Sequence, residues 1–259
     1  MGHIQLPKRL LAAVLAGALT FTQAAAFSDT SGHWAENAIS KWSEEYGIIN
    51  GYDDGTFRPD QSITRGAFAG ILDRFLKFRT VSPASTFSDT PGTYWETAIL
   101  KLHASGVYLG NNGMALPSDT ITRQQAVAMI ARSFQIEGDT TTLTYTDGDQ
   151  VADYARGYVA EMTRRGYITD SANGYFRPTD PITRAEIVSI LNNMVDVLVQ
   201  STTPYSKDTD GTLLINSSSG ATLEHMNIGG DLILAPGVQG TVSLENVTIE
   251  GDVRNFSGV

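Results

Sequence analysis

The chain has 259 residues, of which 41% are hydrophobic, and its 18 basic and 28 acidic side chains give a formal net charge of −10. Such an acidic chain lacks the basic face that binding to nucleic acid requires, so no nucleic-acid partner is predicted. It contains no cysteine, which excludes disulfide bonds and thiolate zinc sites, whereas its length permits a packed core.

Residues 1–26 are predicted to be a signal peptide. Lys8 and Arg9 form a charged start, an apolar run follows over 10–21, and Ala24-Ala25-Ala26 suits the small-residue cleavage rule. A buried N-terminal helix is the alternative, and the run is too short to cross a bilayer. We therefore expect export, with cleavage beside Phe27 and no membrane association afterwards.

A unit of about 60 residues then occurs three times, over 27–80, 81–140 and 141–202. Each copy contains the word Ile-Thr-Arg shortly after a proline, at Ile63–Arg65, Ile121–Arg123 and Ile182–Arg184. Self-similarity at one period is the mark of a repeat architecture.

Each copy is predicted to begin with a helix that follows an aromatic residue and an aspartate. The aspartates are Asp29, Asp89 and Asp147, and a second aromatic follows at Trp34, Tyr94 and Tyr154. Apolar residues then recur at helical spacing, and a glycine closes each pattern at Gly47, Gly106 and Gly166. Glycine just past the last periodic residue indicates a helix C-cap.

A second helix is predicted after a glycine-containing loop and a threonine N-cap, which is Thr64, Thr122 or Thr183. Thr183 and Glu186 make a complete capping box, Gln125 is a permitted variant, and Ala67 leaves the first copy incomplete. The apolar stripe of one such helix cannot be buried alone. We therefore predict a mainly α, pseudo-threefold helical domain in which three second helices converge on one axis.

Arg65, Arg123 and Arg184 fall in the first turn of these second helices, where the helix dipole disfavours a cation. A lone arginine there is ordinarily solvated or ion-paired. Recurrence in all three copies favours a ligand instead, because free N–H groups at the helix start and a guanidinium together suit a carboxylate. Since the arginine opposes the dipole, its replacement by alanine is expected to leave folding nearly unchanged.

These motifs together resemble the S-layer homology (SLH) domain over Phe27 to Gln200. The first copy carries Gly-Tyr-x-Asp-Gly-Thr-Phe-x-Pro, and the third carries the full Thr-Arg-Ala-Glu. Copies one and two depart from that word, with Gly66-Ala67 and Gln124-Gln125. The resemblance implies non-covalent anchoring of an exported protein to the Gram-positive cell wall.

The resemblance also implies the ligand, a secondary cell wall polysaccharide with a pyruvylated N-acetylmannosamine end, held in grooves between repeats. The residues implied to bind it are Asp29, Trp34, Arg65, Asp89, Tyr94, Arg123, Asp147, Tyr154 and Arg184. For the aspartates a turn or cap role stands beside sugar contact, and for the aromatics core packing stands beside stacking on a sugar ring. The departures of copies one and two from Thr-Arg-Ala-Glu predict that the three grooves differ in their affinity for this polysaccharide.

The segment 203–259 carries a second repeat, because Leu223–Leu232 aligns with Leu244–Val253 at a period of 21. Alternating aliphatic and polar residues with glycine corners predict a short, incomplete parallel β-helix-like segment. Leu223 should stack on Leu244, Ile228 on Ile249 and Leu232 on Val253, all pointing inward. Such a small segment is expected to unfold separately from the helical domain.

No catalytic group, cofactor or metal site is predicted, so the chain is expected not to be an enzyme. His225 stands alone, and the calcium-like words Asp147–Asp149 and Asp208–Gly211 do not continue to the required glutamate. The expected function is wall anchoring, with self-association in an S-layer as a further partner. Two alternatives remain open: a wall-tethered polysaccharide-degrading enzyme with its catalytic part in or beyond the strands, and a structural S-layer subunit.

Overall fold

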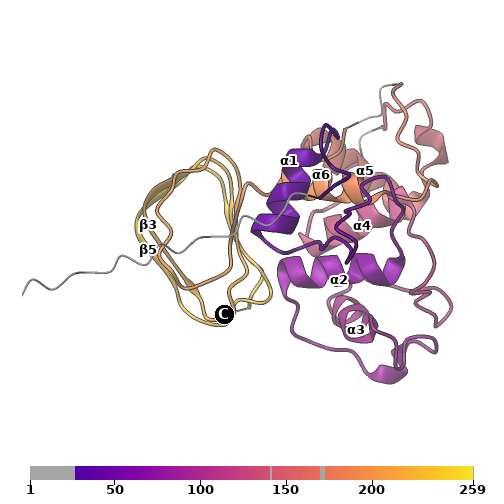
Figure 1. The fold of residues 1–259 in the computed structure, drawn as a ribbon, viewed down its shortest axis with the longest axis horizontal. Coiled ribbons are helices and arrows are strands. Elements are labelled where there is room, and N and C mark those ends of the chain that lie inside the picture. The colour runs from indigo at the N-terminus through magenta and orange to yellow at the C-terminus, as the bar shows by residue number, and fades with distance from the viewer. Residues whose placement is uncertain (1–26, 141, 170–172, 259) are drawn as a thin grey trace, which may run out of the picture.

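The computed structural model describes residues 27–140, 142–169 and 173–258, in which a helical region and a region of parallel strands lie side by side (Figure 1). The predicted signal peptide, residues 1–26, lies outside the described residues. The α-helices are α1 Glu36–Ile39, α2 Arg65–Leu76, α3 Glu96–Ala104, α4 Arg123–Ser133, α5 Asp153–Arg164 and α6 Arg184–Met194.

Each repeat is a pair of helices, as predicted. In the first copy α1 continues as a π-helical segment over Ser40–Glu45, and short 3-10 turns occur at Ala84–Thr86 and Gly148–Gln150. The glycines that close the first helices, Gly47, Gly106 and Gly166, have φ angles of 65°, 70° and 72°. The predicted C-caps are therefore confirmed, since a side chain is strained in this left-handed region.

The second helices begin at the three motif arginines, after the predicted threonines. Thr64 Oγ1 accepts a hydrogen bond from Ala67 N at 3.2 Å. At the third copy Thr183 Oγ1 accepts from Glu186 N at 3.2 Å, and Glu186 Oε2 accepts from Thr183 N at 2.9 Å. The capping box read from Thr183 and Glu186 is thus confirmed.

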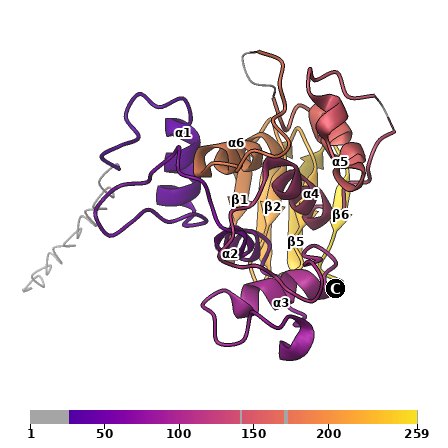
Figure 2. The ribbon, with the colours of Figure 1, turned by 90° about the vertical axis from the view of Figure 1, so that its right-hand side faces the viewer.

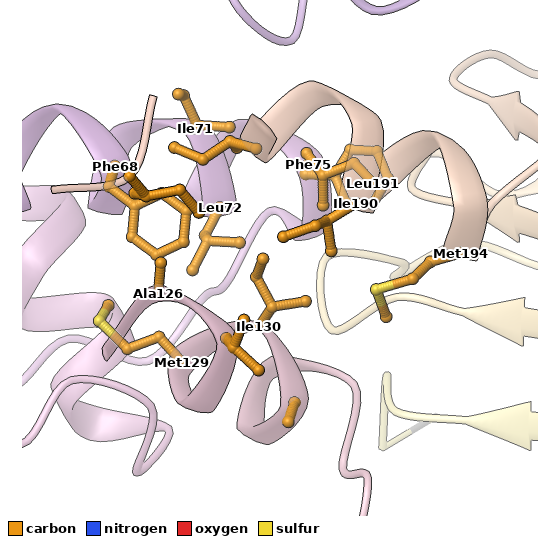
Figure 3. Packing of buried hydrophobic residues seen from close by; sticks show 14 of the residues in the cluster. Phe68, Ile71, Leu72, Phe75, Ala126, Met129, Ile130, Ile190, Leu191 and Met194 are labelled. Atoms are coloured by element: carbon orange, nitrogen blue, oxygen red, sulfur yellow. The ribbon is translucent and has the colours of Figure 1, made fainter. Parts of the chain in front are cut away.

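Helices α2, α4 and α6 converge on one core, as predicted (Figure 3). Phe68, Leu72 and Phe75 of α2 face Ile130 of α4 and Leu191 of α6, and all five are fully buried. Above this core the three Ile-Thr-Arg words are joined in a ring of backbone hydrogen bonds. Ile63 N donates to Ile182 O, Ile182 N to Ile121 O, and Ile121 N to Ile63 O, at 3.1–3.3 Å.

The strands form two parallel sheets. Their bounds are β1 Val197–Val199, β2 Leu213–Ile215, β3 Ala221–Ile228, β4 Leu232–Leu234, β5 Val242–Ile249 and β6 Val253–Asn255. One sheet has the order β1-β2-β4-β6 and the other pairs β3 with β5. With their connections they trace superimposed loops in Figure 1. The three predicted pairs are confirmed: Leu223 with Leu244, Ile228 with Ile249 and Leu232 with Val253.

The predicted inward burial holds for only one member of each pair. Leu223, Ile228 and Leu232 are fully buried, whereas Leu244 is 48% and Val253 is 60% exposed. Among the described residues β5 pairs with β3 and β6 pairs with β4.

The strand region is not the separate unit that the sequence suggested. Leu198, Leu214 and Ile233 belong to the same buried cluster as the helices, which lie over the sheet in Figure 2. Strand β1 also begins at Val197, ahead of the predicted boundary at 203, because the chain enters the sheet directly after α6.

Groups from the strand region also complete the ends of two helices. Asn216 Nδ2 donates to Phe75 O at 2.9 Å, Gly237 N to Leu76 O at 3.1 Å, and Arg254 Nη2 to Phe134 O at 3.1 Å. The last carbonyls of a helix have no partner within it, so these contacts satisfy groups at the ends of α2 and α4.

Candidate functional site: grooves between the repeats

Three grooves, called A, B and C here, each take side chains from all three repeats. Every groove combines the motif arginine of one repeat, the loop and second helix of the next, and the early aromatic of the remaining one. Groove A has Arg184, Arg74 and Tyr94; groove B has Arg65, Arg132 and Tyr154; groove C has Arg123, Asn193 and Trp34. This arrangement follows from the closed ring of the Ile-Thr-Arg words.

Groove B is an open, cationic cavity of about 350 Å³. Arg65 Nε donates to Ala115 O at 2.9 Å, and its guanidinium lies 4.9 Å from the ring centre of Tyr108. Arg132 Nη1 donates to Val107 O at 2.9 Å. Tyr154 is 49% exposed at the rim, and the described lining includes these two arginines and no acidic residue.

Groove C is a larger cavity, about 540 Å³, whose arginines are already paired. Arg123 Nη1 lies 3.2 Å from Glu186 Oε1, and Arg177 Nη2 donates to the same oxygen. Burial lowers the pKa of the Arg123 guanidinium, and the Glu186 charge opposes that shift. Trp34 is 64% exposed and lines the cavity together with Asn193.

Groove A is filled by a tryptophan. Arg184 donates through Nε to Phe57 O at 2.8 Å and through Nη2 to Asn50 O at 2.7 Å. The ring of Trp95 lies so close to α2 that a Cβ at Gly66 would stand 2.4 Å from Cδ1 and a Cβ at Gly70 2.6 Å from Cζ3. Glycine in place of the alanine of the motif, at Gly66, therefore makes room for Trp95.

The motif arginines are structural, and two of them, Arg65 and Arg123, also line cavities. The residues Arg123 and Arg184 are only 6% and 8% exposed, and each motif guanidinium donates to a backbone carbonyl of the next repeat around the ring. Truncation to alanine would remove one hydrogen bond from each of these carbonyls, which argues against the expectation that folding stays nearly unchanged. The carbonyl of Ala115 would keep a second donor, the hydroxyl of Tyr108 at 2.6 Å.

The free backbone N–H groups expected at the helix starts are also absent from this part of the structure. Arg65 N donates to Asp119 O at 2.8 Å and Gly66 N to Pro117 O at 2.9 Å, and the other two second helices repeat these bonds with the next repeat. Because these backbone N–H groups are already bonded, an anion in a groove would have to be bound by the guanidinium groups instead.

The early aspartates hold the loops. Asp29 accepts from Phe57 N at 2.8 Å and Arg58 N at 2.7 Å, and Asp89 and Asp147 make the same pair of bonds in their copies. Burial alone would raise the pKa of Asp29, but these N–H groups lower it below its usual value. Each aspartate thus fixes a left-handed residue, Arg58, Leu116 or Arg177, and none of the three aspartates lines cavity B or C.

Three groove residues were missed by the sequence analysis. Arg74, Arg132 and Asn193 each stand nine residues after a motif arginine, on the second helix of their copy. Their equal spacing was the available signal, but a polar residue on a helix surface ordinarily needs no explanation.

The described part of the chain also bears on membranes and metals. No helix within it is long and apolar enough to cross a bilayer, and no three carboxylate or histidine side chains gather there as a metal site would require.

Comparison with known proteins agrees with the repeat geometry. The profile of the S-layer homology domain matches residues 26–69, 86–127 and 144–188, which is just over half of the chain. The chain belongs to the S-layer homology family. Each matched segment covers the first helix of one repeat and ends within the first turns of the second helix, which begins with the motif arginine.

Several longer proteins share this S-layer homology region. An amylopullulanase of Thermoanaerobacterium thermosulfurigenes is 27% identical over 66% of this chain and 9% of its own length. A cellulosome-anchoring protein of Acetivibrio thermocellus is 37% identical over 40% of the chain and 24% of its length. S-layer protein EA1 of Bacillus anthracis is 25% identical over 70% of the chain and 22% of its length. The chain spans less than a quarter of each.

Proposed function

We propose that this chain anchors an exported protein non-covalently to the Gram-positive cell wall by holding a pyruvylated secondary wall polysaccharide in its grooves. The observation that carries the proposal is groove B, where Arg65 and Arg132 line a cavity without any acidic residue in its described lining. Anchoring at the cell surface is supported by membership of the S-layer homology family and by the anchoring and S-layer proteins among the relatives.

The chemistry of groove B suits a ketal-linked pyruvate. Such a group is a carboxylate fixed on a sugar ring, and a guanidinium offers it two parallel N–H donors. Nε of Arg65 donates to Ala115 O and Nη1 lies 3.4 Å from Gln125 Oε1, and these contacts orient the guanidinium in the cavity. The exposed ring of Tyr154 gives the apolar face of a sugar a surface to lie on.

The proposal extends to the rest of the chain. Residues 1–26 act as a signal peptide, the chain itself binds without catalysing a reaction, and the two parallel sheets begin a β-helix-like region. Incubation with purified wall polysaccharide is expected to release no reducing sugar, and release that persists after repurification would contradict the non-catalytic role.

A pull-down on wall sacculi tests the anchoring. The unmutated chain should sediment with sacculi that carry the secondary polymer and remain in solution when the polymer has been extracted. Arg65→Lys keeps the positive charge but removes the paired N–H donors of the guanidinium. It should therefore weaken binding to the sacculi about tenfold or more, measured by sedimentation. Lys207→Ala, an exposed cation of the strand region, is the matched control and should sediment normally.

Binding to sacculi that lack the polymer, at the same affinity, would contradict the proposal. Thermal melting of each variant separates lost folding from lost binding, which matters because Arg65 also bonds to Ala115.

A further inference from the structure

The third residue of the second helix differs among the copies: Ala67, Gln125 and Glu186. All three occupy the same position in their helices, three residues after the cap threonine. Gln125 lines cavity B and Glu186 lines cavity C, so the two open grooves differ at this position by an amide in place of a carboxylate.

In groove C the protein itself supplies the anion. Glu186 Oε1 receives both Arg123 and Arg177, while Oε2 accepts the N–H of Thr183. Only 12% of the Glu186 side chain is exposed. A ligand carboxylate placed against Arg123 would therefore meet a second negative charge at close range and away from bulk water, where like charges repel strongly.

In groove B the equivalent residue, Gln125, makes the same cap interaction as Glu186 but carries no charge. Gln125 Oε1 accepts the N–H of Thr122 at 3.1 Å and lies 3.4 Å from Arg65 Nη1. The position of Arg177 is taken here by Leu116, and Arg132 adds a second cation on the helix. The positive charge of groove B is therefore not neutralised by the lining residues that the structure describes.

We infer that the residue at this helix position determines the charge of the sugar that each groove binds. With the neutral Gln125, groove B binds an anionic sugar, and with the anionic Glu186, groove C binds a neutral one. The inference rests on the proposed function. Moving a carboxylate out of water is costly unless a cationic partner receives it. The described lining of groove B has two arginines and no carboxylate, whereas in groove C both arginines already share Glu186. Groove C offers Asn193, Ser189 and the face of Trp34, which suit hydroxyl and N-acetyl groups.

Reciprocal substitution tests this assignment. Gln125→Glu and Glu186→Gln exchange the two side chains without changing their length, and both residues still accept the N–H of the cap threonine. Isothermal titration would use N-acetylmannosamine carrying a pyruvate ketal and the same sugar without it. Gln125→Glu should weaken binding of the pyruvylated sugar at least about tenfold, and Glu186→Gln should add a second site for it.

The control is Gln125→Ala, which removes the cap interaction without adding charge. It should reduce thermal stability more than it reduces affinity for the pyruvylated sugar. As single substitutions in the otherwise unmutated chain, Arg65→Lys should abolish binding of the pyruvylated sugar and Arg123→Lys should leave it unchanged.

The outcomes separate the inference from the proposed function. If the unmutated chain binds neither sugar, the proposed function itself fails. If it binds the pyruvylated sugar and Gln125→Glu leaves that affinity unchanged, or if the site depends on Arg123 and not on Arg65, the function stands and the charge assignment is overturned.

Discussion

The helical region and the strand region are both built from repeats, but the helical repeats join in a ring whereas the strand turns stack in a line. The three helical units join head to tail through Ile63, Ile121 and Ile182, so each unit has a neighbour on both sides. In the strand region Leu223 pairs with Leu244 and Leu232 with Val253, one turn beside the next. A ring gives every copy a shared core, whereas linear stacking gives each turn contacts with its neighbours along the line.

Closure also creates the grooves between the repeats. A groove needs an arginine, a helix and an aromatic residue from three different units, and only a ring brings these together three times. The strand region has no counterpart of this, and it contributes to the helical region by completing the ends of α2 and α4.

The largest effect should come from a side chain at the centre of the closed region. Phe75→Ala empties a fully buried site between Trp42 and Phe134, whose ring centres lie 5.0 and 6.0 Å away. We expect a loss of about 3–5 kcal/mol in the free energy of unfolding, measured with urea. A loss below about 1 kcal/mol would mean that the three helices do not share this core.

Within the strand region, two stacked leucines should differ. Leu223 is fully buried and Leu244, directly paired with it, is 48% exposed. Leu223→Ala should cost about 2–4 kcal/mol, and Leu244→Ala about 1 kcal/mol or less. Equal losses in the two variants would contradict the difference in burial between the two leucines.

Asp147, which bonds to the loop, should contribute more to stability than Asp149, a nearby aspartate of equal charge. Asp147→Ala leaves the buried N–H of Phe176 without a partner and releases Arg177, so we expect a loss of about 2–3 kcal/mol. Asp149→Ala removes the same charge from an exposed position and should change stability by less than about 0.5 kcal/mol. Thermal melts of the pair, run side by side, make the comparison.

The smallest effect depends on pH. Hydrogen bonds from Arg164, and then Arg165, lower the pKa of Glu161 from its usual 4.5 to about 2 in the folded chain, although burial opposes this. The stabilisation is therefore complete above about pH 4.5 and disappears as the pH falls towards 2. Glu161→Gln should cost about 1–2 kcal/mol between pH 5 and 7, because screening by solvent limits the gain, and the difference should shrink in acid. A difference that is constant down to pH 3 would contradict this.

The local pattern made much of the closed region predictable. Thr183 with Glu186 marks a helix start, and Gly47 marks a helix end, because caps and left-handed turns demand particular side chains within a few residues. Identical words about 60 residues apart then predicted three equivalent helices that share a core. The strand register was predictable for the same reason, since Leu223 and Leu244 stand in matching sequence contexts.

The grooves were less predictable, because their character depends on contacts between copies. Trp95 fills groove A only because Gly66 and Gly70 lie beneath it, and these residues are far apart in the sequence. Asp29 was a candidate for sugar contact, yet its oxygens serve the loop some 28 residues later. Nothing local indicates that Arg254 reaches the end of α4, so the packing of strands on helices could not be foreseen.

Binding in the grooves is tested most directly by titrating the isotope-labelled chain with pyruvylated N-acetylmannosamine and following side-chain and backbone NMR signals. The Nε–H signal of Arg65 and the backbone signals around Tyr154 and Gln125 are expected to shift together and saturate, while those of β5 and β6 stay in place. Saturable shifts confined to the strands, or none around groove B at saturating sugar, would contradict the assignment of the grooves as the site of wall anchoring.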